Sequence, residues 1–191
     1  MQYVLDLLTN HNFSIPEERV VTTVYPETFK SQLKIARIVT TRRHGFVYRS
    51  DNEVRATGLQ LNSSENIDFA YIIANRYGPY AIICEEFEYI ADDDNFTGLD
   101  LAVFVGCETA ASASDGSSFT KDIADQGARV AIGFKKEIDC AEANTWTMRF
   151  YDYLLEGVSV TDAARLAYQG LSQDGNLCSY AIHGDADYAF Y

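Results

Sequence analysis

The chain has 191 residues, which is long enough for one substantial hydrophobic core and short for two. It carries 15 Lys and Arg against 28 Asp and Glu. The resulting net charge of −13 excludes a general nucleic-acid binder and disfavours adhesion to anionic membranes. A hydrophobic content of 47%, with 13% aromatic residues, excludes a disordered chain. We therefore expect a single globular domain over residues 1–191, whose partners are neither nucleic acid nor membrane.

The first 35 residues or so predict no targeting segment and one short helix. The opening sequence MQYVLDLLTNHN has no basic region and no long apolar run, and no later stretch nears the roughly 20 apolar residues of a membrane span. We therefore expect neither a signal peptide nor a transmembrane segment, and a cytoplasmic location. Residues 26–34 predict a short helix with Pro26 at its start.

Residues 35–66 predict the N-terminal part of a sheet. Residues 35–41 (IARIVTT) and 46–49 (FVYR) are rich in β-branched and aromatic side chains and predict strands. The polar, turn-rich stretch 51–66 predicts a loop or hairpin. Residues 1–66 are the part of the chain that the sequence explains least.

From residue 67 the pattern alternates between apolar strands and amphipathic helices, with an acidic loop expected at 85–95. Strands are predicted at 67–75, 80–84, 99–106, 129–134 and 179–185. Helices are predicted at 117–127, ending at Gly127, at 139–156, and in a segment that begins with Ser159 and Asp162 in a capping box. Strands that alternate with helices in this way are typical of an α/β sheet with helices packed on its faces.

Cysteine usage predicts neither a disulfide framework nor a metal site. The four cysteines form no CxxC or CxxH pair, and we expect each to be reduced and buried. The acidic run 92–94 lacks the alternating ligands and the glycine of a calcium loop. Neither GxGxxG nor GxxxxGK[ST] occurs, so no nucleotide cofactor is expected, and a flavodoxin-like ligand-binding domain has no phosphate loop to support it.

Two strand ends carry candidate chemistry. In open α/β sheets functional residues gather at the carboxyl ends of strands, and here strand 67–75 leads into Asn75-Arg76-Tyr77-Gly78 while strand 99–106 leads into Cys107-Glu108. We expect these two strand ends to be adjacent. Cys107 follows a buried strand and precedes small polar residues, which is where a nucleophile would be exposed. A buried core thiol is the alternative.

Four segments, taken in order, resemble the caspase-like cysteine peptidases, with the CHAT domains and gingipain-type peptidases as the nearest members. They are LAVFVGCETA (101–110), GARVAIGF (127–134), EGVSVTDAARLAY (156–168) and SYAIHGDADY (179–188). The resemblance covers about residues 67–190. It implies a three-layer sandwich, with a mostly parallel sheet and helices on both faces. It also implies that Cys107 is the nucleophile.

The resemblance further implies a base in a His-Gly pair that ends the strand before the nucleophile. The matching pair in FAYIIANRYG is Tyr77-Gly78. A tyrosine with a pKa near 10 does not readily accept a thiol proton at neutral pH. The first prediction is therefore a degenerate site, in a non-catalytic or weakly active module that binds a protein or peptide. In an active site, backbone N–H groups near Gly78, Gly106 and Cys107 would form the oxyanion hole. In either case Arg76 or Glu108 would contact the bound group.

The second prediction is an active cysteine endopeptidase in which His44, of the pair His44-Gly45, is the base. Gingipain-type relatives select Arg or Lys through an acidic pocket. If the acidic stretch 85–94 plays that part here, cleavage would follow basic residues; a solvated loop is the alternative. His183-Gly184 is expected to end the last strand without a catalytic role, and His11 to lie on the surface. The sequence leaves the oligomeric state open.

Overall fold

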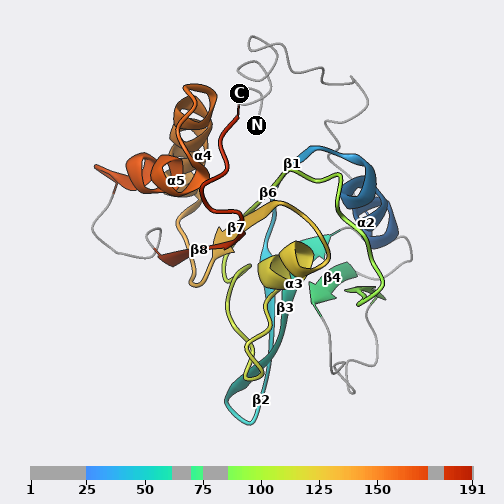
Figure 1. Ribbon diagram of the computed structural model, residues 1–191. Coiled ribbons are helices and arrows are strands. Elements are labelled where there is room, and N and C mark those ends of the chain that lie inside the picture. Colours follow the sequence, from blue (N-terminus) through green and yellow to red (C-terminus); the bar gives the residue numbers. More distant parts are fainter. Residues whose placement is uncertain (1–24, 62–69, 75–85, 172–178, 191) are drawn as a thin grey trace.

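The computed structural model describes residues 25–61, 70–74, 86–171 and 179–190 (Figure 1). Its elements follow the chain as α2 (Pro26–Ile35), β1 (Ile38–Arg42), β2 (Gly45–Ser50), β3 (Glu53–Leu61), β4 (Ala70–Ala74), β5 (Glu86–Ile90), β6 (Leu101–Val105), α3 (Phe119–Asp125), β7 (Val130–Phe134), α4 (Cys140–Leu155), α5 (Val160–Tyr168) and β8 (Tyr180–Gly184). No helix among these residues has both the length and the apolar character needed to cross a bilayer.

The central sheet has the strand order β1-β6-β7-β8. The first three strands are parallel, and β8 runs antiparallel to β7. Every residue of β6 and β7 is buried, because both faces of these two strands are covered. This burial explains why their sequences are continuous apolar runs.

The second sheet has the order β2-β3-β4-β5. The strands β2 and β3 form an antiparallel hairpin through a turn at Asp51 and Asn52, which both adopt positive φ. The hairpin extends away from the helices (Figure 1). Because β2 starts at Gly45, three residues after β1 ends, the hairpin root lies at the carboxyl end of the central sheet.

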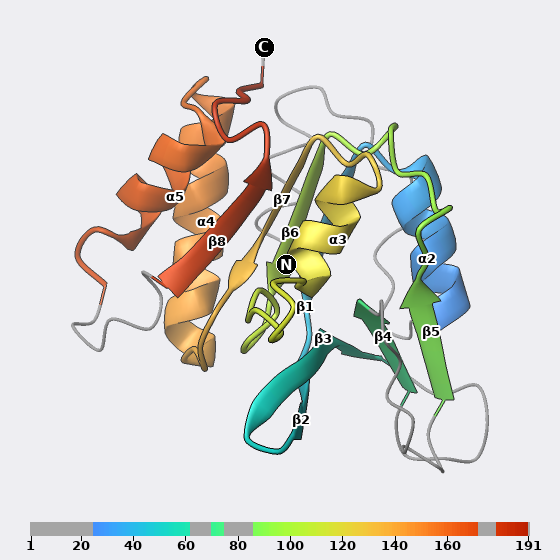
Figure 2. The ribbon, with the colours of Figure 1, turned by 60° about the horizontal axis from the view of Figure 1, so that its bottom comes forward.

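Helices cover both faces of the central sheet (Figure 2). On one face, α4 and α5 pack on β6 and β7 through an aromatic cluster. In that cluster the ring of Trp146 stacks on Phe150 and meets Phe134 edge-on, with centroid separations of 4.9 and 5.1 Å. On the other face, α2, α3 and residues of β3 share a second core with β6 and β7. The result is a layered α/β arrangement.

Most of the expected elements are confirmed. The helix predicted at 26–34 is α2, the strands predicted at 99–106 and 129–134 are β6 and β7, and the helix at 139–156 is α4. Ser159 caps α5 by accepting a hydrogen bond from the backbone N–H of Asp162. The α/β class with a mostly parallel four-stranded sheet is also confirmed, whereas the caspase-like assignment stays a prediction.

The hairpin expected in the stretch 51–66 is confirmed for residues 51–61, which supply its turn and the strand β3. Two other expectations are wrong. The acidic stretch 85–95 contains the strand β5, because pairing with β4 overrides the low β-propensity of its polar residues. The expected adjacency of strands 67–75 and 99–106 is also wrong. β4 lies in the second sheet, and the neighbours of β6 are β1 and β7. The strand predicted at 80–84 lies outside the described residues.

Candidate functional site

The carboxyl ends of β1 and β6 bring residues 42–45 beside Gly106 and Cys107. The two strands are parallel and in register, with Arg42 opposite Val105. Beyond the last paired residues, the backbone N–H of Arg43 donates to the carbonyl of Val105 at 3.3 Å. His44 follows directly, and its carbonyl accepts a hydrogen bond of 2.9 Å from the backbone N–H of Gln60 in β3. The backbone on both sides of His44 is therefore fixed.

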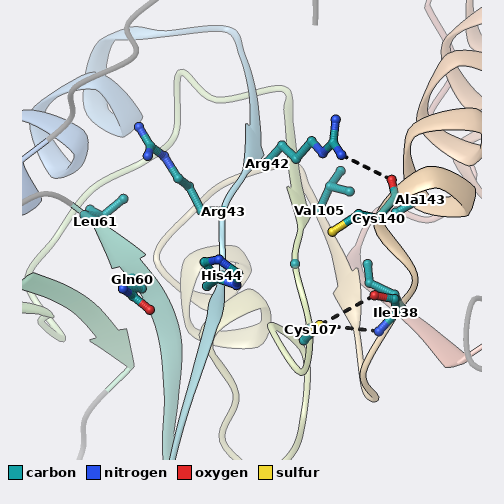
Figure 3. A pocket seen from close by; sticks show the side chains of 11 residues that line it. Arg42, Arg43, His44, Gln60, Leu61, Val105, Cys107, Ile138, Cys140 and Ala143 are labelled. Atoms are coloured by element: carbon teal, nitrogen blue, oxygen red, sulfur yellow. Dashed lines mark hydrogen bonds between the residues drawn. The ribbon is translucent and has the colours of Figure 1, made fainter. Parts of the chain in front are cut away.

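Both His44 and Cys107 line a pocket of about 390 Å³ at this edge of the sheet (Figure 3). The pocket extends from the end of β3 across β1 and β6 to the first turn of α4. The His44 side chain is exposed, and Cys107 is half-buried. The lining residues are Arg42, Arg43, His44, Gln60, Leu61, Val105, Gly106, Cys107, Ile138, Cys140 and Ala143.

Two glycines allow the strand ends to approach so closely. A Cβ added at Gly45 would lie 1.5 Å from the carbonyl oxygen of Cys107, and one added at Gly106 would lie 2.3 Å from the carbonyl oxygen of Arg43. Both separations are far below a van der Waals contact, so any larger residue requires the backbone to move. Glycine at these two positions thus sets the distance between the His44 and Cys107 segments.

The thiol of Cys107 contacts the segment between β7 and α4. Its sulfur accepts a hydrogen bond from the backbone N–H of Ile138 at 3.4 Å and lies 3.7 Å from the carbonyl oxygen of the same residue (Figure 3). The sulfur therefore contacts both a backbone donor and a backbone acceptor of Ile138.

The turn after Cys107 is held by a buried threonine. The hydroxyl of Thr109 lies 3.0 Å from the carbonyl oxygen of Phe104 and 3.1 Å from that of Gly106, and it accepts a hydrogen bond from the backbone N–H of Phe134. Glu108, which lies between Cys107 and Thr109, has a φ of 55°, which is unusual for a non-glycine residue. The turn that carries the candidate nucleophile is thus rigid and locally strained.

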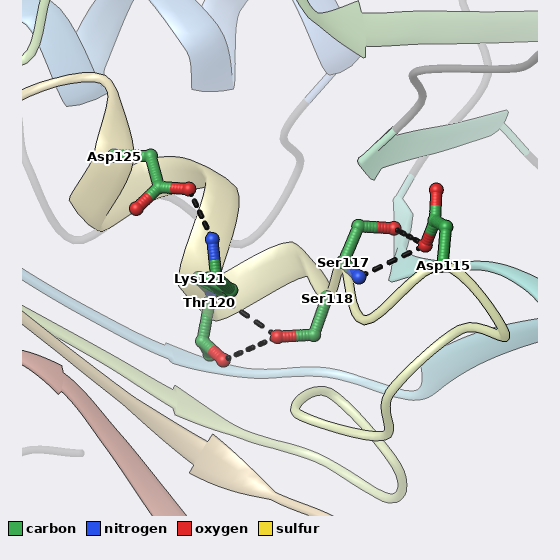
Figure 4. A network of polar contacts seen from close by, with 6 residues as sticks. All are labelled: Asp115, Ser117, Ser118, Thr120, Lys121 and Asp125. Atoms are coloured by element: carbon green, nitrogen blue, oxygen red, sulfur yellow. Dashed lines mark hydrogen bonds and ion pairs between the residues drawn. The ribbon is translucent and has the colours of Figure 1, made fainter.

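The loop that follows connects the site to α3. The backbone N–H of Ser114 donates to the carbonyl of Val54 in β3, and Ser118 caps α3 by accepting from the backbone N–H of Lys121. Asp115 accepts hydrogen bonds from Ser117 within the same loop (Figure 4). These contacts anchor the loop to β3 and to the start of α3, so we assign the loop a structural role.

Glu108 does not line the pocket. Its carboxylate forms an ion pair with Arg49 of β2, which ties the turn after Cys107 to the hairpin. Glu108 is therefore already paired with Arg49, and its predicted contact with a bound group stays a prediction. The position of Gly106 in the pocket wall fits the role predicted for it.

The structure distinguishes His44 from His183. His44 shares the pocket with Cys107. His183 does not, because β8 runs antiparallel and pairs His183 with Ala131 near the amino end of β7, at the opposite edge of the sheet. The expectation that His183 has no catalytic role is consistent with this position. His11 lies outside the described residues.

Three other predicted site residues, Arg76, Tyr77 and Gly78, also lie outside the described residues, so their roles stay predictions. The expectation of buried thiols is wrong for Cys140, which is exposed at the start of α4, and for the half-buried Cys107. Cys84 and Cys178 are outside the described residues. Within the described part of the chain, no group of three potential ligands could hold a metal ion.

The sequence did not predict three of the residues that line the pocket. Arg42, Gln60 and Cys140 come from three separate segments, and no local pattern marks them as neighbours of Cys107. The one signal in the sequence was the pair His44-Gly45 after a β-branched run. It indicates the end of a strand, and the structure places that strand end beside Cys107.

No protein-family model matches the sequence, and no curated protein matches it at a significant level. The resemblance to caspase-like peptidases therefore has only the residues quoted above in its support. What the chain can do must be inferred from the geometry of the pocket.

Proposed function

We propose that the chain is a cysteine endopeptidase in which Cys107 is the nucleophile and His44 the general base. One observation carries the proposal: a histidine and a cysteine end two neighbouring parallel strands and line the same pocket. A nucleophile with a base close by, at the carboxyl edge of an α/β sheet, is the arrangement that thiol acyl transfer requires.

In the proposed reaction, the imidazole of His44 takes the thiol proton and the sulfur attacks a peptide carbonyl. The oxyanion that forms is stabilised by the backbone N–H groups of Gly45 and Cys107, which stand at the same two strand ends. Collapse of the tetrahedral intermediate expels the amine, which leaves with the proton from His44. Water then hydrolyses the thioester, which releases the acid and regenerates the thiol.

One observation favours the non-catalytic alternative. The Cys107 sulfur contacts the backbone of Ile138, so it must turn about the Cα–Cβ bond to face His44. A module that only binds a peptide needs no such rotation. In the proposed enzyme, the Ile138 contact holds the resting thiol, and substrate binding favours the second rotamer.

The test is the pH profile of alkylation at Cys107, resolved from Cys140 by peptide mass spectrometry on the native protein. We expect Cys107 to be alkylated faster than Cys140 at neutral and mildly acidic pH, and to lose this advantage in His44→Ala. His183→Ala is the matched control. Equal profiles for Cys107 and Cys140, together with no cleavage of a diverse peptide library, would favour the binding module.

A further inference from the structure

Two free thiols line the pocket, and they come from different elements. Cys107 follows the last residues of β6, and Cys140 is the first residue of α4. Cys107 is half-buried, whereas Cys140 is exposed. Because both thiols line the same pocket and one of them is exposed, a small reagent dissolved in water can reach the pair there.

The Cys107 sulfur already contacts the segment that leads into Cys140. The backbone N–H of Ile138 donates to that sulfur at 3.4 Å, and Cys140 lies two residues after Ile138. Two residues of chain span at most about 7 Å, so the Cα atom of Cys140 stays within that distance of the Cα atom of Ile138. Figure 3 shows the Cys140 sulfur pointing from α4 toward the end of β6. Rotation of the two side chains is the movement that we expect to bring the sulfurs together.

The backbone at Cys140 is held in place by side chains on both sides of the pocket wall. The guanidinium of Arg42, at the end of β1, donates to the carbonyl of Cys140 at 3.3 Å. The carboxylate of Asp139 caps α4 by accepting hydrogen bonds from the backbone N–H groups of Ala141 and Glu142, at 2.8 and 2.9 Å. The first turn of α4 is thus tied to the central sheet, and Cys140 is held at the pocket beside the Cys107 segment.

We propose that Cys107 and Cys140 form a site of reversible oxidation by peroxides, in which Cys140 is the resolving cysteine. In the first step the Cys107 sulfur attacks one peroxide oxygen, the O–O bond breaks, and Cys107 becomes a sulfenic acid as water leaves. The Cys140 sulfur then attacks the Cys107 sulfur, the S–O bond breaks, and a second water leaves as the disulfide forms. The two thiols together lose two electrons and two protons, and hydrogen peroxide is reduced to water.

The order of the two steps follows from the surroundings of Cys107. It shares the pocket with His44, whose neutral imidazole can take the thiol proton. Without a resolving thiol, a sulfenic acid is oxidised further to a sulfinic acid, which dithiothreitol does not reduce. The disulfide with Cys140 therefore blocks Cys107 as a nucleophile and preserves it for later reduction. The oxidation requires no peptide cleavage, so this inference is independent of the proposed peptidase activity.

The first experiment looks for the disulfide in the wild-type chain. The native protein is treated with hydrogen peroxide, its remaining thiols are alkylated, and it is digested without reductant. Trypsin, together with a protease that cuts after Glu, places each of the four cysteines on a separate peptide. We expect a linked pair of peptides that contains Cys107 and Cys140 and that dithiothreitol separates. Linkage of Cys107 to Cys84 or Cys178, or sulfinic acid at Cys107 without the disulfide, would overturn the proposal.

The second experiment tests the resolving role of Cys140. After equal exposure to peroxide and then to dithiothreitol, the share of Cys107 that iodoacetamide alkylates should be at least about threefold lower in Cys140→Ser, because sulfinic acid accumulates. Cys178→Ser is the matched control, since it also removes one thiol, and it should recover as the wild type does. Circular dichroism confirms that both variants are folded. Equal recovery in Cys140→Ser and the wild type would contradict a resolving role.

These results are distinguishable from those that test the peptidase. A chain that cleaves peptides through Cys107 but forms no disulfide with Cys140 keeps the proposed function and loses this inference. A chain that forms the disulfide and cleaves no peptide loses the proposed function and keeps this inference.

Discussion

Two His-Gly pairs end strands of the central sheet, and the fold gives them opposite surroundings. His44-Gly45 follows β1, at the edge where the parallel strands end, and His44 lines the pocket with Cys107. His183-Gly184 ends β8, which runs the other way, so it lies beside the amino end of β7. The dipeptide alone does not distinguish them. Strand direction decides which histidine meets the thiol.

The two histidines also differ in burial. His44 is exposed at the pocket, whereas His183 is half-buried in the sheet. Burial lowers the pKa of His183 below its ordinary value, and the nearby cation Lys121 adds to the effect. We therefore expect substitution of His44 to change the activity of the site, and substitution of His183 to change mainly the pH dependence of stability.

The largest expected difference is in activity. His44→Ala should lower the rate of peptide cleavage by about 10²- to 10⁴-fold, which is the usual loss when a general base is removed. His183→Ala should leave the rate within about twofold, measured as kcat/KM on the same peptide with matched folded protein. Equal losses in both variants would remove the catalytic distinction between the two pairs.

The two glycines provide the next comparison. Gly45→Ala would place a Cβ 1.5 Å from the carbonyl oxygen of Cys107, and Gly184→Ala would place one 2.1 Å from the carbonyl oxygen of Arg129 at a φ of 91°. We expect each substitution to lower the free energy of unfolding by about 1–3 kcal/mol or more, measured by urea denaturation.

Alkylation separates the two glycine variants. Under conditions in which both remain folded, only Gly45→Ala should change the rate at Cys107, because only that backbone shift reaches the thiol. A change of similar size in Gly184→Ala would mean that Cys107 reports the stability of the whole sheet.

Local pattern predicted those parts of the fold in which burial is uniform along an element. β6 and β7 are buried at every residue and read as continuous apolar runs, and α4 and α5 have the helical spacing of one buried face. Capping residues such as Ser159 also act over three residues, so their effect is visible in the sequence. These elements form the core of the central sheet.

Pairing between distant strands was not predictable in the same way. β1 is short and only partly buried, so nothing in residues 38–42 indicates that β6 is its neighbour. The strongly apolar β4 was the natural candidate, yet it belongs to the second sheet. The sequence of β6 alone was enough to predict Cys107 as the candidate nucleophile. Predicting His44 as its base required a contact between residues 63 positions apart, so His44 entered only in the second of the two functional predictions.

Two threonines hold the backbone near Cys107 and near the second His-Gly pair, and they can be compared in the same way. Thr109 has its hydroxyl buried between three backbone groups of the Cys107 turn, whereas the exposed Thr161 donates to the carbonyl of Ala186, just after the second His-Gly pair. Thr109→Val should lower the free energy of unfolding by about 1–3 kcal/mol, because buried backbone groups lose their partner.

Thr161→Val should cost less than about 1 kcal/mol, since the carbonyl of Ala186 keeps the hydrogen bond that it accepts from the backbone N–H of residue 161. Thr109→Ser keeps the hydroxyl and should recover most of the loss. If the valine variants at both positions were equally stable, the turn after Cys107 would not depend on its internal hydrogen bonds.

The smallest expected effect is the pH dependence of stability that arises from His183. Its pKa in the folded chain lies below the unfolded value near 6.5, because burial and Lys121 disfavour the charged ring, Asp125 opposes them in part, and Lys135 adds to them. Between those two pKa values the unfolded chain binds more protons, so the free energy of unfolding falls as the pH drops through that window. Above about pH 6.5 the term is constant.

Replacing His183 by Gln should flatten this part of the profile by less than about 1 kcal/mol, because the ring is half-exposed and solvent screens the charges. Lys121→Gln should also flatten it, since it removes a cation and leaves Asp125 to favour the protonated ring. Urea denaturation from pH 5 to pH 8 measures both slopes. A steeper slope in Lys121→Gln would mean that the Lys121–Asp125 ion pair, rather than the buried ring, governs the pH response at this edge of the sheet.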